Sequence, residues 1–224
     1  MSLISSLSPL VAQDSNDQEG GIRFRTLGWN LSADDLFYSF KNQDTKVELT
    51  ESSRSIFHAA GRAKQLTFYR IITGPDDKPM QEVAATVNIE TAGPWPLLIF
   101  MKDPRSPKRF RVAAIADDLK TFPFPSTQFV NFTGVDMDAK LGDQVVKVAG
   151  GGLARIDPRI QAGKESDTRF TAISWNSPAG RRVLYSNNWV VKPNQRTIVF
   201  ISSQDNRILV MRIRDNIAIY APRN

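Results

Sequence analysis

The chain consists of short apolar runs separated by turns, and the order of these runs is repeated. An F-x-x-F segment occurs at 37–40 and again at 129–132, each followed by a similar series of apolar runs. Matching residues lie 92 to 100 positions apart: Phe40 and Phe132, Leu49 and Leu141, Phe100 and Phe200, and Asp117 and Asp215. Offsets drift in this way when loops change length while strands keep theirs. The sequence therefore predicts an internal duplication.

Strand periodicity dominates within both copies. Ile22-Arg23-Phe24-Arg25 alternates apolar and polar residues, as a half-buried strand does, because successive side chains point to opposite faces. The strands predicted for the first copy lie at 36–41, 46–49, 54–58, 65–73, 82–90, 97–102 and 109–116. Those predicted for the second lie at 128–133, 138–141, 144–148, 153–156, 168–176, 182–191, 196–202 and 207–214.

Frequent turns between short strands are typical of a β-sandwich. Proline-containing turns, Gly74–Pro79 and Ser177–Gly180, join the longest strands at equivalent points of the two copies. We therefore predict an all-β, internally duplicated chain of two tandem β-sandwich domains, with immunoglobulin-like architecture and about seven or eight strands each. The predicted organisation is a tail at 1–20, sandwiches at 21–120 and 128–224, and a proline-rich linker at 121–127. The alternative is one larger sandwich or barrel to which each copy contributes half.

Composition limits the chemistry that is available. The chain has no cysteine, which excludes disulfides, thiolate metal sites and cysteine nucleophiles, and we expect no cofactor. Its net charge of +6 comes from residues 181–224, which hold eight basic and two acidic residues. Because these arginines are spread over several predicted strands, we expect solvated strand faces and no nucleic-acid partner.

The amino terminus suggests export. Residues 3–13 resemble the apolar tail and small-residue end of a secretory signal, although a basic segment before them is missing. We expect an exported protein, periplasmic or extracellular, with 1–20 as a signal-peptide remnant. A disordered or cloning-derived tail on a cytoplasmic protein is the alternative. No apolar stretch approaches the roughly 18 residues that predict a transmembrane helix.

Aromatic and amide residues cluster on the long predicted hairpin of the second copy. The candidate ligand-binding residues are Trp175, Tyr185, Trp189, Asn187, Arg181 and Arg182. Exposed rings can stack on a sugar while amides hydrogen-bond its hydroxyl groups. The alternative is that these rings fill the core, where large aromatics usually lie.

Catalytic and metal sites are not predicted. His58, the only histidine, has Ser52, Ser53 and Ser55 nearby in sequence but no recognisable orienting third group. Asp136, Asp138 and Asp143 form an incomplete ligand set for calcium, and a polar turn explains them. Gly150-Gly151-Gly152 lacks the Lys-Ser/Thr of a phosphate loop and is expected to be a turn.

Three functional hypotheses follow. The first is a non-catalytic, exported interaction or envelope-associated module with a protein or glycan partner. The second is a carbohydrate-binding module that uses the aromatic residues of the second copy. The third is a hydrolase built on His58 or on carboxylates. Because each candidate site residue occurs in only one copy, we expect function where the copies differ. The expected places are the second copy, with its arginines and tryptophans, or the groove between the two copies.

Overall fold

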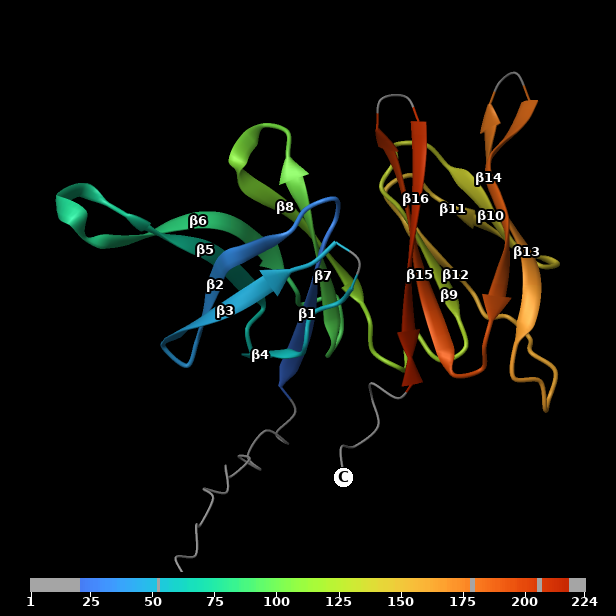
Figure 1. Cartoon of the computed structure of the whole chain (residues 1–224), viewed down its shortest axis with the longest axis horizontal. Coiled ribbons are helices and arrows are strands. Elements are labelled where there is room, and N and C mark those ends of the chain that lie inside the picture. Colours follow the sequence, from blue (N-terminus) through green and yellow to red (C-terminus); the bar gives the residue numbers. More distant parts are fainter. Residues whose placement is uncertain (1–20, 52, 178–179, 205–206, 218–224) are drawn as a thin grey trace, which may run out of the picture. The chain divides into compact units, whose positions relative to one another are not determined.

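The computed structural model describes residues 21–51, 53–177, 180–204 and 207–217 (Figure 1). The chain divides into two compact units, Met1–Ile115 and Ala116–Asn224, called unit 1 and unit 2 here. Residues 1–20, which include the signal-like segment, lie outside the described part. No helix among the described residues is long and apolar enough to cross a membrane.

Unit 1 contains two four-stranded sheets, ordered β4-β1-β7-β8 and β3-β2-β5-β6. Strands β1 and β7 pair in parallel, whereas β4 with β1, and β2 with β3 and β5, pair antiparallel. The strands are β1 Ile22–Gly28, β2 Ala33–Phe40, β3 Gln43–Leu49, β4 His58–Gly61, β5 Gln65–Thr73, β6 Pro79–Asn88, β7 Pro96–Asp103 and β8 Ser106–Ala116.

Unit 2 repeats this topology with strand numbers raised by eight. Its sheets are ordered β12-β9-β15-β16 and β11-β10-β13-β14, and β9 and β15 form the parallel pair. The strands are β9 Thr127–Asn131, β10 Met137–Leu141, β11 Gln144–Val148, β12 Leu153–Ile156, β13 Asp167–Ser177, β14 Gly180–Val191, β15 Gln195–Gln204 and β16 Arg207–Asn216. The predicted all-β, duplicated fold is confirmed.

The match between the two F-x-x-F segments is wrong. Residues 37–40 belong to β2, whereas 129–132 cover the end of β9, whose counterpart is β1. The backbone amides of Trp29 and Phe132 each donate a 2.7 Å hydrogen bond to the parallel neighbour strand, so Trp29 is the residue that matches Phe132. The pairing of Leu49, in β3, with Leu141, in β10, fails similarly. Phe100 matches Ile201 and not Phe200, because Gly28 is opposite Phe100 as Asn131 is opposite Ile201. An apolar alternation looks alike in every half-buried strand, which explains the error.

Each unit has its own apolar core between its two sheets. The core of unit 1 contains four packed rings, those of Phe24, Tyr38, Phe68 and Phe100. Three edge-to-face contacts join them, with ring centroids 5.0 to 5.9 Å apart. In unit 2 the ring of Phe129 stacks on Trp189, with centroids 6.5 Å apart, and aliphatic side chains fill the remainder. One sandwich shared by both copies is therefore not the arrangement observed.

A β-bulge interrupts the long hairpin of each unit at the same step. In β5–β6, Ala84 is the extra residue opposite the Phe68–Tyr69 step. In β13–β14, Leu184 is the extra residue opposite the Ile173–Ser174 step. A bulge bends its strand and re-aims the side chains that follow it. Each hairpin thus has an inner half that packs in the sandwich and a more exposed outer half (Figure 1).

A fully buried arginine anchors the opening segment of unit 2. Arg196 on β15 places Nη2 3.1 Å from Asp117 Oδ1 and 3.0 Å from Asp215 Oδ2. Its Nη1 donates to the Phe122 carbonyl at 2.7 Å, and its guanidinium lies 4.6 Å from the centroid of the Phe122 ring. These contacts attach the segment that contains Asp117 and Phe122 to β15 and β16. Part of the predicted linker therefore packs within unit 2.

We expect Arg196→Met to destabilise unit 2 by about 3–5 kcal/mol, because it leaves two buried carboxylates without their cation. Urea unfolding followed by circular dichroism measures the loss. Arg214→Met, at an exposed position of β16, is the control and should change the free energy of unfolding by less than about 0.5 kcal/mol. Equal effects of the two substitutions would contradict the proposed anchoring.

Candidate functional site

The residues predicted to bind a ligand lie in different environments on the β13–β14 hairpin. Arg181, Arg182 and Asn187 are exposed on β14. Trp175 on β13 is partly exposed, and Tyr185 is half-buried. These five side chains are thus exposed in different degrees, and Arg181 Nε also donates to Ser174 Oγ at 3.0 Å.

Trp189 lies in the core of unit 2. Only 3% of its surface is exposed, and its indole Nε1 donates to the Tyr185 hydroxyl at 3.0 Å. One ring face stacks on Phe129, and the Arg212 guanidinium lies 4.8 Å from the ring centroid. An indole with this packing has no free face for a sugar, which agrees with the core interpretation of this ring.

The structure brings Trp175 and Arg182 together in one pocket of about 580 Å³, called the Trp175 pocket here. Its size is within the range of ligand pockets in proteins. Residues of five strands, β10, β13, β14, β15 and β16, line the pocket, among them Met137, Leu184, Ser203, Arg207 and Ile208. Sequence reasoning missed Met137, Arg207 and Ile208, because they come from strands far away in the sequence.

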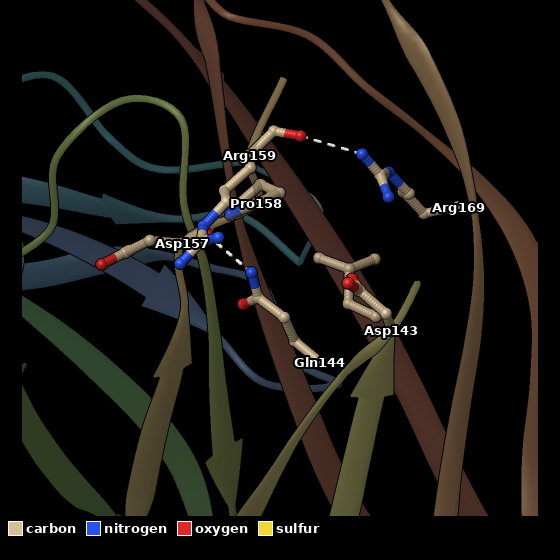
Figure 2. Close-up of a pocket in the computed structure, with 7 residues that line it drawn as sticks. Asp143, Gln144, Asp157, Pro158, Arg159 and Arg169 are labelled. Atoms are coloured by element: carbon tan, nitrogen blue, oxygen red, sulfur yellow. Dashed lines mark hydrogen bonds between the residues drawn. The ribbon is translucent and has the colours of Figure 1, made fainter. Parts of the chain in front are cut away.

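A second pocket of about 610 Å³ lies at one end of unit 2 (Figure 2). Arg169 on β13 places Nη2 2.6 Å from Asp167 Oδ2 and donates to the Arg159 carbonyl at 2.8 Å. Gln144 Nε2 donates to the Asp157 carbonyl at 3.3 Å. Several of these polar groups are therefore engaged in contacts within the chain.

The three aspartates considered for calcium point to different partners. Asp136 Oδ2 lies 2.7 Å from Lys147 Nζ, and hydrogen bonds from Lys147 and the Gly150 amide lower the pKa of Asp136. Asp138 accepts a hydrogen bond from Asn176, and Asp143 lines the second pocket. No cluster of acidic or histidine residues suited to a metal ion occurs in the described part of the chain.

His58 begins β4 and lines a third pocket, of about 370 Å³. Its ring stacks on Phe24 with centroids 5.3 Å apart, and its buried Nε2 has no hydrogen-bond partner among the described residues. The Ser55 hydroxyl donates to the Ile56 carbonyl and accepts from the Thr26 amide. No serine–histidine hydrogen bond forms in the described residues; Ser52 lies outside them.

Comparisons with known proteins give no family. No protein-family model and no curated protein matches the chain. One solved structure with some likeness is titled "Crystal structure of a putative cell adhesion protein from Bacteroides uniformis". The two chains are 11% identical, with 89% of this chain and 99% of that chain covered and a TM-score of 0.21. So low a score supports no argument about fold or function.

We expect the protein to become less stable at acidic pH because His58 is buried. Burial lowers the pKa of His58 below its usual 6.5, so the unfolded chain binds the proton more readily than the folded one. The folded state therefore loses stability as the pH falls below about 6.5. Melting temperatures at pH 8 and pH 5.5 measure this, with His58→Gln as the comparison. The drop should be smaller in the variant; identical drops would show that another group is responsible.

The two tryptophans of the hairpin should differ in their contribution to stability. Trp189→Ala removes a buried ring and should destabilise unit 2 by about 3–5 kcal/mol. Trp175→Ala removes a partly exposed ring and should cost much less, because little packing is lost. Urea unfolding of both variants tests the assignment. Equal losses would contradict the placement of Trp189 in the core and Trp175 at the surface.

Proposed function

We propose that this protein is a non-catalytic, exported binding module that contacts a protein partner through strand β14 of unit 2. The observation that supports the proposal is the mixed surface on this edge strand. Five exposed residues along this strand are called the β14 surface here: Arg181, Arg182, Val183, Asn187 and Val190. Because successive side chains of a strand point to opposite faces, these residues lie on both faces of the edge strand.

Exposed apolar groups beside arginines are typical of protein-binding surfaces. Val183 is 58% exposed and Val190 is 44% exposed, although both belong to a regular strand. Arginine is enriched at protein interfaces, where its long stem covers apolar surface and its head forms several hydrogen bonds. Strand β14 is also the last strand of its sheet, so one row of its backbone groups faces no other strand of that sheet.

Export and envelope association are part of the same proposal. They rest on residues 3–13, whose sequence resembles the end of a secretory signal. Mass spectrometry of the native product from each cell fraction tests this point. A mature chain that retains Met1 would end the export proposal.

A carbohydrate partner is the second candidate, and the observation that favours it is the partly exposed ring of Trp175 beside Asn176. A ring at the rim of a pocket can stack on a sugar face while a neighbouring amide hydrogen-bonds its hydroxyl groups. A change in tryptophan fluorescence with a glycan panel, lost in Trp175→Phe, would favour this candidate over a protein partner.

The protein-binding proposal predicts that partner capture depends on the β14 surface. Arg181→Glu with Val183→Asp reverses one charge and places a carboxylate on the apolar part, so retention of the partner should fall at least about tenfold. The control is Gln81→Glu with Val83→Asp, which places the same two carboxylates at the corresponding positions of β6.

Cross-linking and affinity capture from envelope and cytosolic fractions, at low and moderate salt, provide the measurement. We expect the unchanged protein and the control to retain the same envelope protein and the β14 variant to lose it. Retention by all three, or by none, would contradict the proposal.

A further inference from the structure

The Trp175 pocket has a counterpart in unit 1 that can be located by the shared bulge. Opposite residues just beyond the bulge are Arg70 and Glu82 in unit 1. In unit 2 the same two positions hold Trp175 and Arg182. The two copies therefore differ in both ring content and charge at one equivalent place.

In unit 1 this place is closed by internal contacts. Arg70 Nε lies 2.8 Å from Asp35 Oδ2, and its Nη1 donates to the Lys108 carbonyl at 2.7 Å. The guanidinium also lies 5.0 Å from the centroid of the Phe110 ring. Lys108 Nζ in turn is 3.0 Å from Glu82 Oε1. One arginine thus joins β5 to β2 and β8 and occupies the space between them.

In unit 2 the groups that would close the space are absent or turned away. Trp175 replaces the arginine, and the aspartate that corresponds to Asp35 is Asp136, which pairs with Lys147. Arg182 stands where unit 1 has an acidic residue. Neither Arg182 nor Arg207 forms an ion pair with another described residue, so two cations border the pocket without an anion from the described chain.

Hydrogen bonds of a buried asparagine fix the backbone beside the apolar part of the pocket. The buried amide of Asn131 donates from Nδ2 to the carbonyls of Val135 at 2.8 Å and Val148 at 3.2 Å, and its Oδ1 accepts from the Thr133 amide at 2.9 Å. Val135 is one of the lining residues, and Met137, also in the lining, is only 1% exposed. A pocket supported in this way needs little rearrangement to accept a ligand.

Two guanidinium groups beside apolar side chains fit a carboxylate on an apolar stem. A free fatty acid and the carboxyl terminus of a protein both have this chemistry. The edge of β14 favours the second, because its row of backbone groups can pair with an extended peptide that ends in the pocket. Resting on the proposed protein-binding function, we infer that the Trp175 pocket binds the carboxyl terminus of a partner chain that ends in a large apolar residue.

The probe is the peptide N-acetyl-Gly-Ser-Gly-Phe with a free terminal carboxylate, titrated into the full chain by calorimetry. We expect saturable binding of one peptide per chain. The same peptide with a terminal amide should bind at least about tenfold more weakly, because the charge-assisted hydrogen bonds are lost. Arg182→Glu, which introduces the acidic residue found in unit 1, should weaken binding of the free acid to a similar degree.

Arg214→Glu is the matched control, since it makes the same charge change on β16 outside the pocket and should alter the affinity by less than about twofold. Equal binding of acid and amide, equal loss in both variants, or binding of octanoate but not of the peptide would overturn the inference. None of these three outcomes would contradict the proposed protein-binding function, provided that capture of the partner protein still depends on the β14 surface. Peptide binding without any captured partner would instead contradict the proposed function alone.

Discussion

The extra residue in each long hairpin is the constraint on which the differences between the two units depend. Ala84 and Leu184 interrupt equivalent ladders at the same step, and in each hairpin the inner half packs in a sandwich while the outer half is more exposed. The scaffold is thus the same in both copies. Whether the space beside the bulge is closed or open depends on the side chains around it, chiefly Arg70 with its partners in unit 1 and Trp175 with Arg182 in unit 2.

Unit 2 also contains buried charged residues, and these stabilise its fold. Transfer of Arg196 from water into the interior is costly, and carboxylates, a carbonyl and an aromatic face offset that cost only in one arrangement. Next to this cluster, burial raises the pKa of Asp118, but hydrogen bonds from the Thr121 and Lys120 amides outweigh burial and leave that pKa lowered. Buried charge therefore holds this segment in one conformation, whereas the charges at the Trp175 pocket remain available.

The sequence predicted most strands and the duplication, because alternation and hairpin turns are local signals, although the strand expected at 54–58 lies at His58–Gly61. Two of the residues proposed to bind a ligand, Trp175 and Arg182, line the Trp175 pocket. It could not align the copies strand by strand, since apolar alternation is the same in β1, β2 and their counterparts. Neither bulge residue has a recognisable sequence signature. Arg207 and Asp117 act through contacts with residues distant in sequence, and such contacts leave no periodic pattern.

The two copies share a scaffold, and we propose that binding occurs where their side chains differ. Methyl-resolved NMR of the full chain, titrated with the free-acid peptide, tests this at both places at once. We predict shifts of the methyl signals of Val183, Leu184 and Ile208, which line the Trp175 pocket, with Val83 and Ile71 of the matching hairpin unchanged. Equal shifts at both hairpins, or shifts confined to unit 1, would rule out selective binding at the Trp175 pocket.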